Sequence, residues 1–354
     1  MATIIISRNS YIILSSSCKL VEGKFRAVLI DYLRRELYYL DKEYSSFLKF
    51  LNRKQVCEVE NILDDGTSIE NFYSFLNFLL SKELAFLTDN PSLFPAVSDE
   101  LRESPNTINN SIITINTHTF SKDLFLHICK ELKSTLCFEY QVRMYGADWI
   151  KLIKPICNYL ATYGARYIEI TGVHPKEDIT LLEDLIATIP LLSRVYVFGA
   201  SDNTIQIVSN NKNSEEYISY GEIYFSKSDY NPIRSCGLIS KHSLDFSSFH
   251  AYNKYKVVNG CLYKKVSIDE FGEVRNCPSQ SISFGNIQEK SLLEIVSTEK
   301  FRKLWYLTKD NIENCKDCEL RYCCTDCRFI LENPSNSLSK PLNCKYDIKS
   351  GCWS

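Results

Sequence analysis

The stretch NCKDCELRYCCTDCR, residues 314–328, sets the character of the C-terminal part of this chain. It contains two C-x2-C pairs, Cys315 with Cys318 and Cys324 with Cys327, and five residues separate the pairs. A C-x2-C turn holds two thiolates on one side of a tight loop, as a tetrahedral metal or the corner of an iron–sulfur cubane requires. The stretch therefore predicts a metal centre.

Three further cysteines extend this pattern. Ten residues separate Cys261 from Gly272, four separate Gly272 from Cys277, and sixteen separate the second pair from Cys344. Gly272 lies in DEFGEV, residues 269–274, a hairpin turn signal that would bring Cys261 and Cys277 close across two strands. The predicted metal ligands are Cys261, Cys277, Cys315, Cys318, Cys324, Cys327 and Cys344.

The spacing favours iron–sulfur clusters over zinc. A zinc ribbon separates its two C-x2-C pairs by about 15–20 residues, whereas the gap here is five. Seven thiolates also exceed one tetrahedral site, so two clusters fit better, with one ligand from elsewhere or one position left open. Zinc stays the alternative. Structural free thiols are disfavoured because free cysteines usually occur singly in cores.

Composition narrows the class of protein further. The 354 residues carry a net charge of −2, and no run of Lys or Arg forms a basic patch, which argues against nucleic-acid binding. No apolar stretch reaches the roughly 18–20 residues of a membrane span, and the N-terminus has no signal-peptide pattern. We therefore expect a cytoplasmic protein, where clustered cysteines indicate metal chemistry more often than disulfides.

Residues 1–95 predict a winged-helix-like module. Apolar runs at Tyr11–Leu14 and Phe25–Ile30 flank Gly23 and suggest a hairpin. Two amphipathic helices follow at Lys42–Leu51, after Asp41 as a possible N-cap, and at Ser68–Leu80, and a last strand is expected at Leu84–Leu87.

Residues 105–235 alternate between strand and helix patterns. Such alternation predicts parallel strands with right-handed crossovers, in an open α/β sheet or a partial barrel. Strands are expected at Ser111–Ile115, Cys137–Met144, Tyr167–Thr171, Ser193–Phe198 and Glu222–Phe225, and helices at Asp123–Leu132, Ala147–Tyr163 and Ile179–Ile189.

Residues 250–354 are rich in cysteine and poor in regular patterns. One helix is expected, at Ser291–Trp305, and the remainder predicts loops and short strands. A segment of this kind could hardly form a core of its own, so clusters or metals would have to stabilise it.

The C-terminal pattern resembles the SPASM domain, the auxiliary-cluster module of many radical-SAM peptide maturases. The resemblance covers about residues 258–354, and its details are similar to the maturase of grasp-with-spasm systems. There, a SPASM protein is paired with an ATP-grasp ligase and a short ribosomally made precursor peptide. The matching segments are NGCLYKK (259–265), Gly272 to Cys277, FGNI (284–287), CKDCELRY (315–322), CTDCR (324–328) and KPLNCKYD (340–347).

The resemblance implies two [4Fe-4S] clusters. Cys261, Cys277 and Cys327 would hold the first cluster; the second would be held by Cys315, Cys318, Cys324 and Cys344. The chain departs from the usual pattern in its last pair, where three intervening residues are common. The pair Cys323 and Cys327 has three intervening residues, but using it would shorten the five-residue interval after Cys318 to four. A fourth ligand for the first cluster is not obvious, and Cys236 and His250 are candidates.

The middle region resembles a radical-SAM partial (β/α)6 barrel that has lost its catalytic iron. Radical-SAM enzymes carry C-x3-C-x2-C after the first strand, but the loop at residues 116–122 has no cysteine. Cys129, Cys137 and Cys157 fit core positions. Gly146 fits a simple strand-to-helix turn, and the alternative is a relic of a SAM-contacting loop. S-adenosylmethionine is therefore a doubtful cofactor, and no catalytic residue is predicted.

The resemblance also implies a function. The N-terminal module is similar to winged-helix leader-recognition domains, which add an extended peptide to a sheet edge. We expect a protein that binds a precursor peptide and supports its maturation with an ATP-grasp ligase. A redox or SAM-dependent enzyme with an open auxiliary cluster and a zinc-stabilised adaptor are the alternatives, so whether the chain is an enzyme stays open.

Overall fold

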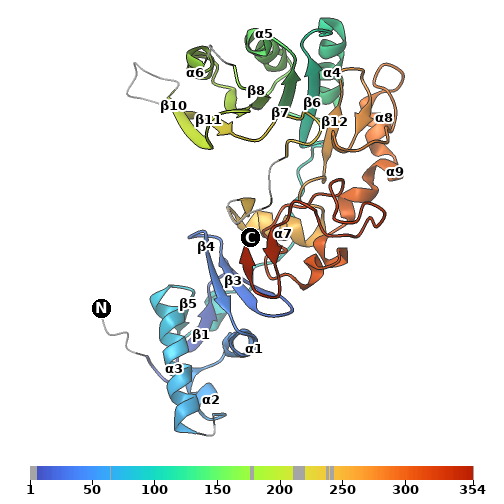
Figure 1. The fold of residues 1–354 in the computed structure, drawn as a ribbon. Helices are drawn as coiled ribbons and strands as arrows, with labels where there is room; N and C mark the ends of the chain where they lie inside the picture. Colours follow the sequence, from blue (N-terminus) through green and yellow to red (C-terminus); the bar gives the residue numbers. More distant parts are fainter. Residues whose placement is uncertain are drawn as a thin grey trace. The chain divides into compact units, whose positions relative to one another are not determined.

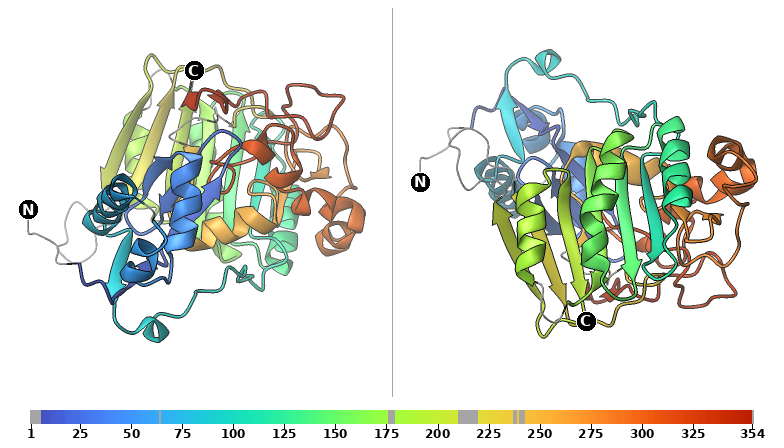
Figure 2. Two further views of the ribbon diagram at one scale, coloured as in Figure 1. Left: turned by 90° about the horizontal axis from the view of Figure 1, so that it is seen from below. Right: turned by 90° about the horizontal axis from the view of Figure 1, so that it is seen from above.

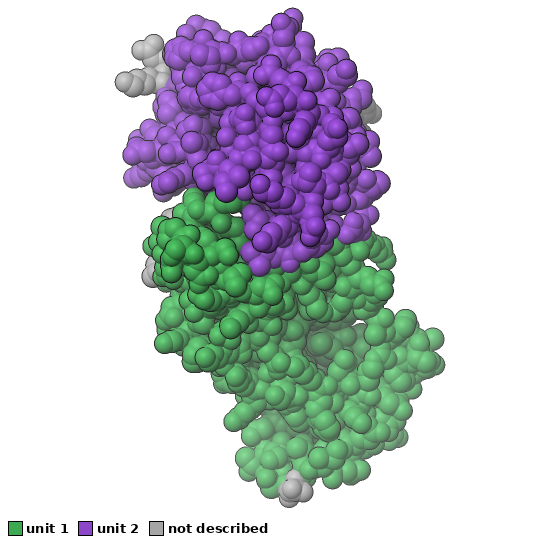
Figure 3. Space-filling model, turned by 90° about the vertical axis from the view of Figure 1, so that its right-hand side faces the viewer, with its two compact units in different colours: residues 1–102, 238–260, 308–354 green, residues 103–237, 261–307 purple. Residues whose placement is uncertain are grey.

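A computed structural model of the chain describes residues 6–63, 65–175, 179–209, 220–236, 239 and 243–353 (Figure 1). Residues 1–5, on which the expectation of no signal peptide partly rests, lie outside this description, as do short parts of the predicted 105–235 segment. The described chain divides into two compact units (Figure 3). Unit 1 comprises residues 1–102, 238–260 and 308–354, and unit 2 comprises residues 103–237 and 261–307. The predicted third segment, 250–354, thus contributes to both units.

Unit 2 is built on an eight-stranded sheet with the order β10-β11-β9-β8-β7-β6-β12-β13. The six central strands run parallel, and the two edge strands, β10 and β13, are antiparallel. The strands are β6 Asn110–Asn116, β7 Glu139–Tyr145, β8 Tyr167–Val173, β9 Leu192–Phe198, β10 Thr204–Ser209, β11 Tyr220–Ser226, β12 Lys265–Ile268 and β13 Val274–Arg275. The predicted α/β class and its five strands are confirmed, whereas β10 was not predicted.

Helices α4 Lys122–Ser134, α5 Trp149–Thr162 and α6 Ile179–Thr188 cover one face of this sheet (Figure 2). When each new parallel strand is added on the same side of the previous one, right-handed crossovers place every connecting helix on the same face of the sheet. The wall of a (β/α) barrel has the same arrangement of strands and helices, although a partial barrel stays a prediction. The buried sides of the helices include Cys129 and Cys157, and Cys137 is buried before β7, which confirms their assignment to the core.

The N-terminal part of unit 1 contains the predicted elements with one different pairing. Its strands are β1 Tyr11–Leu14, β2 Cys18–Glu22, β3 Ala27–Asp31, β4 Glu36–Leu40 and β5 Ala85–Thr88, and its helices are α1 Lys42–Leu51, α2 Val56–Glu60 and α3 Gly66–Ser81. The hairpin predicted between Tyr11–Leu14 and Phe25–Ile30 is wrong. Strand β1 pairs with β5, and Gly23 lies in the turn between β2 and β3. The winged-helix assignment stays a prediction.

Packing explains why the distant strands β1 and β5 meet. Ile12 of β1 and Ala85 of β5 join one buried core with α1 and α3, through residues such as Leu51 and Phe72. The contribution of that shared core outweighs the local hairpin signal at Gly23.

The C-terminal segment is irregular, as expected, but its helix prediction is wrong in detail. The predicted helix Ser291–Trp305 is divided into α8 Leu292–Ser297 and α9 Glu299–Arg302, followed by a 3-10 turn. Thr298 between them has extended backbone angles, and its side chain accepts a hydrogen bond from the amide of Phe301. An N-cap of this type begins a new helix and so ends the old one. Helix α7, Phe249–Val257, was not predicted.

Within the described ranges, no helix is long and apolar enough to cross a bilayer.

The buried carboxylate of Asp31 stabilises the β3–β4 turn. Its oxygens accept hydrogen bonds from the amide of Leu33 at 2.9 Å and from Nη1 of Arg34 at 3.0 Å. Burial raises the pKa of Asp31, but these hydrogen bonds outweigh burial and hold it below its usual range. A carboxyl of this kind stabilises the fold above its unfolded pKa of about 3.9, and the contribution is lost as the pH falls through the lowered folded value.

We therefore expect Asp31→Asn to lower the free energy of unfolding by about 1–3 kcal/mol at neutral pH, because an amide group would face these donors. Hydrogen exchange of the Ala27–Asp31 amides measures the loss, and the variant should lack the acid dependence of the wild type. Asp41→Asn is the control, since Asp41 is exposed and its side chain caps no helix amide. Equal protection of β3 in both variants would contradict this role of Asp31.

Candidate metal centre

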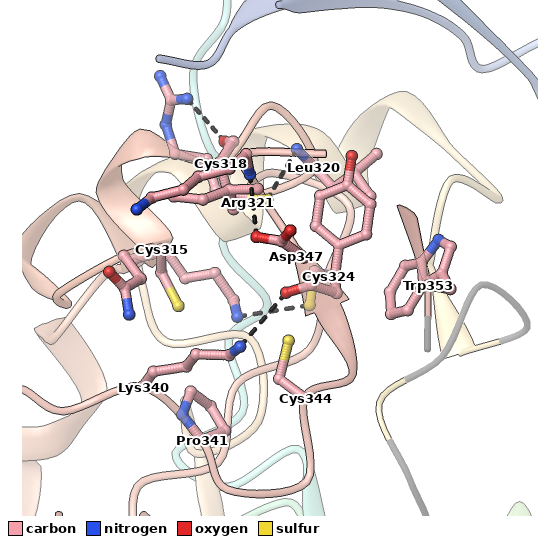
Figure 4. Close-up of a pocket in the computed structure, with 15 residues that line it drawn as sticks. Cys315, Cys318, Leu320, Arg321, Cys324, Lys340, Pro341, Cys344, Asp347 and Trp353 are labelled. Atoms are coloured by element: carbon pink, nitrogen blue, oxygen red, sulfur yellow. Dashed lines mark hydrogen bonds between the residues drawn. The ribbon is translucent and has the colours of Figure 1, made fainter. Parts of the chain in front are cut away.

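Four of the predicted ligands line one cavity in unit 1. Cys315, Cys318, Cys324 and Cys344 surround a volume of about 280 Å³ together with Lys309 (Figure 4). The cavity contains all four cysteines that the resemblance assigns to the second cluster.

Local structure directs these thiols. The first C-x2-C pair forms a 3-10 turn, Cys315–Asp317, in which the amide of Cys318 donates to the carbonyl of Cys315 at 3.0 Å. The amide of Leu320 then donates to Cys318 Sγ at 3.4 Å. Cys324 and Cys344 are each fixed by an isolated bridge, to Leu244 and Ile239 respectively. Amide-to-sulfur bonds of this kind favour thiolates and tune iron–sulfur sites.

A buried cation lies among these sulfurs. Lys309 is only 6% exposed, and its Nζ donates to Cys324 Sγ at 3.4 Å and lies 3.9 Å from Asp326 Oδ1. Burial lowers the pKa of Lys309, but nearby Cys324, Cys315 and Asp326 outweigh it and raise that pKa. A buried ammonium group is costly unless anions compensate it. The lysine therefore indicates a site that carries negative charge.

Burial disfavours the thiolate form of three of these cysteines. Burial raises the pKa of Cys315 to about 11, and it also raises the pKa of Cys318 and of Cys324. A bound metal deprotonates coordinating thiols outright, so metal binding here would release protons.

A single metal ion and a cluster place their thiolates at different distances from one another. Four thiolates on one zinc lie roughly 4 Å apart, because each Zn–S bond is about 2.3 Å. In the part of the chain that the structure describes, no group of three or more Cys, His, Asp or Glu side chains is arranged to hold a single ion. The thiolates of a cubane bind different irons and stand farther apart. Four thiolates around an oxidised cubane carry a net charge of about −2, which Lys309 and Lys340 at the cavity would offset.

Cys323 and Cys324 have different environments. Cys323 is fully buried in an apolar cluster with Tyr32 and Tyr252, and its Sγ donates to the carbonyl of Leu320. Cys324 lines the cavity. The cavity thus favours Cys324 over Cys323 as the predicted ligand.

The remaining predicted ligands are divided between the units. Cys261 and Cys277 belong to unit 2, where they lie at the open ends of the β12–β13 hairpin, and Gly272 takes φ +85° in its turn. Lys265 Nζ donates to Cys261 Sγ at 3.5 Å, and the charges of Cys261 and Cys277 interact. Burial raises the pKa of Cys277 to about 12.

Cys327 belongs to unit 1, so its place in the first cluster stays a prediction. Its Sγ accepts from the amide of Ile330 at 3.4 Å. The neighbouring Asp326 and Arg328 form a buried ion pair at 2.8 Å, and Asn259 Nδ2 donates to Asp326 at 2.8 Å. His250, the other candidate fourth ligand, is exposed on α7.

The loop after β6 holds polar side chains where radical-SAM enzymes carry three cysteines. Thr117 Oγ1 donates to the carbonyl of Ala147 at 2.7 Å, and the ring of His118 lies beside the amide of Ala147. Gly146 takes φ +100°, and a Cβ there would lie 2.3 Å from Thr117 Oγ1. Close approach of the two loops thus explains this glycine without a ligand.

Sequence reasoning did not find the cations beside the sulfurs, Lys309 and Lys265. A lysine has no spacing signal that distinguishes a buried position from an exposed one, so only the fold brings these residues to the cysteines.

Comparison with known proteins supports the C-terminal assignment. Residues 261–319 match the SPASM family, an iron–sulfur cluster-binding domain. This match includes Cys261, Cys277, Cys315 and Cys318 and ends before the other predicted ligands. No curated protein matches the sequence.

Among solved structures, SuiB of Streptococcus suis bound to S-adenosylmethionine is 13% identical with a TM-score of 0.33, over 93% of this chain and 98% of SuiB. SuiB bound to the precursor peptide SuiA is 12% identical with a TM-score of 0.33, over the same shares of the two chains. At TM-scores this low, the likeness supports no conclusion about this chain.

The adjacent cysteines provide a matched test of the cavity. We expect Cys324→Ala to lose the iron bound there, about half of the total if two cubanes are present. Cys323→Ala should keep its iron and lower the free energy of unfolding by about 1 kcal/mol, because it leaves a small void in the core. Iron and sulfide per chain, with a urea unfolding curve, separate the two effects. Equal iron loss in both variants would contradict the assignment.

Proposed function

We propose that this chain is a SPASM iron–sulfur protein that acts in the maturation of a ribosomally synthesised peptide. The observation that carries the proposal is the cavity where Cys315, Cys318, Cys324 and Cys344 surround a buried lysine. The match of residues 261–319 to an iron–sulfur cluster-binding domain supports it independently.

In this proposal the chain holds two [4Fe-4S] clusters. The cavity of unit 1 holds one, and Cys261 and Cys277, with Cys327, hold the other. The clusters, when bound, supply either structural support or one-electron transfer. The role of the polypeptide is to bind the precursor peptide and present it to a partner enzyme, an ATP-grasp ligase.

The N-terminal sheet offers an edge for the precursor. Its order is β2-β3-β4. At the outer side of β2, Lys24 donates its amide to Asp317 at 2.7 Å, and Arg321 Nη1 donates to the carbonyl of Glu22 at 2.6 Å. Strand β4 has no such backbone partner in the described ranges. An extended peptide adds to an exposed edge through backbone hydrogen bonds, so β4 is the better candidate.

Hydrogen-bond alternation identifies which β4 amides face outward. The amide of Gly23 donates to the carbonyl of Arg26, and the amide of Tyr32 donates to the carbonyl of Ser17. Because hydrogen-bonded pairs alternate along an antiparallel ladder, Val28 and Ile30 also bond to β2. Ala27, Leu29 and Asp31 then bond to β4, through Leu40, Tyr38 and Glu36. The amides of Leu37 and Tyr39 are left at the outer edge.

We therefore expect Leu37→Pro to weaken precursor binding by about tenfold, since the ring removes an outward N–H and obstructs the incoming strand. Leu20→Pro is the control, because by the same alternation it blocks an outward amide of β2. Fluorescence anisotropy with the leader of a short peptide encoded beside this gene measures affinity. Equal weakening by the two variants would argue against strand addition at β4.

Metal analysis tests the proposal directly. We expect about eight iron and eight sulfide per chain after purification without oxygen, the content of two cubane clusters. One or two zinc ions with no iron would instead identify a zinc-stabilised adaptor and end any electron-transfer role.

An EPR measurement tests the enzyme alternative. The reduced protein should give the same spectrum with and without S-adenosylmethionine, because the cysteines of the radical-SAM motif are missing from the sequence. A spectrum that shifts on addition of S-adenosylmethionine would identify an open iron and favour a SAM-dependent enzyme.

A further inference from the structure

Arg143 of β7 carries a buried charge, and no carboxylate among the described residues pairs with it. The residue is 3% exposed. Its Nε donates to Gln141 Oε1 at 2.8 Å, its Nη1 to the carbonyl of Pro232 at 2.9 Å, and its Nη2 to Cys236 Sγ at 3.4 Å. A buried guanidinium group is costly without a compensating anion. Of these three partners, only Cys236 can become an anion.

Hydrogen bonds fix the loop that carries Cys236. Arg143 holds the carbonyl of Pro232, and Ser279 Oγ donates to the carbonyl of Ile233 at 2.6 Å. Within the loop, the amide of Asn231 donates to Ser235 Oγ at 2.8 Å. Ser279 follows Cys277 by two residues, so the loop is attached beside a predicted ligand.

A second cation completes the group. Lys265 of β12 donates to Cys261 Sγ at 3.5 Å, and its charge also interacts with Cys277, Cys236 and Arg143. Three thiols thus gather around two cations within unit 2, although 24 residues separate Cys236 from Cys261. That arrangement parallels the cavity of unit 1, where a lysine also donates to a cysteine sulfur.

We propose that Cys236 is an iron ligand of the first cluster, together with Cys261 and Cys277, and that Arg143 positions it. The inference rests on the proposed function and names a ligand for the position that the SPASM pattern leaves open. On binding, the thiol proton of Cys236 passes to solvent, and the thiolate forms a bond to iron. Cys236 then fills a coordination position that the predicted ligands leave open. This assignment favours structural or electron-transfer roles over coordination of a substrate.

Differential alkylation of the wild-type chain tests the ligand. Cys236 and Cys352 are both exposed, so iodoacetamide should modify both in the metal-free protein. After cluster loading, Cys236 should be modified at least roughly tenfold more slowly, because a coordinated thiolate is not free to react. Cys352 should keep its rate. Modification of Cys236 at an unchanged rate in protein that holds eight iron would overturn the proposal.

A variant gives an independent readout. Cys236→Ala should lose iron to a chelator at least roughly tenfold faster than the wild type, with an altered EPR spectrum of one cluster. Cys57→Ala is the control, because Cys57 is a partly exposed cysteine whose Sγ donates to Gln55. An iron-loss rate and spectrum like those of the control would overturn the inference and leave the proposed function intact. A wild-type protein without iron would overturn both.

Discussion

The contact between Arg26 and Glu319 holds the cysteine-rich segment to the N-terminal sheet. Arg26, in the turn between β2 and β3, donates from Nε to Glu319 Oε1 at 2.6 Å and from Nη2 to the Tyr346 hydroxyl at 2.6 Å. Its guanidinium also lies over the ring of Tyr39. Glu319 is almost fully buried and directly follows Cys318. Removing one partner of such a pair typically costs about 3–5 kcal/mol, so the geometry of the cavity depends on an arginine almost 300 residues away.

Buried cations beside sulfur are the common feature of both cysteine groups. Lys309 contacts Cys324 in unit 1, and Lys265 and Arg143 contact Cys261 and Cys236 in unit 2. Asp326 lies 3.9 Å from Lys309 Nζ and compensates part of its charge, whereas neutral thiols would compensate none of the charge of these cations. The placement is consistent with sites that become anionic when a metal binds.

Local patterns predicted the parts of the fold that depend on local interactions. The helix Lys42–Leu51 was predicted at its observed bounds, and the alternation over residues 105–235 gave the parallel strands. Pairing over long distances was missed, because the β1–β5 contact depends on a shared core rather than on the turn between neighbours. The seven cysteines could be selected by spacing. The sequence could not rank Cys236 above His250, because only tertiary structure brings Arg143 to its sulfur.

The path of the chain has a consequence for biosynthesis. It passes between the two units at four places, after residues 102, 237, 260 and 307. The cavity of unit 1 needs Cys344 and Tyr346 from its last part, and the sheet of unit 2 needs β12 beside β6. Unit 2 therefore cannot be completed before the ribosome has translated β12, and the cavity of unit 1 cannot be completed before it has translated Cys344. In the proposed function, delivery of iron and sulfide to the cavity would therefore wait until translation has passed Cys344.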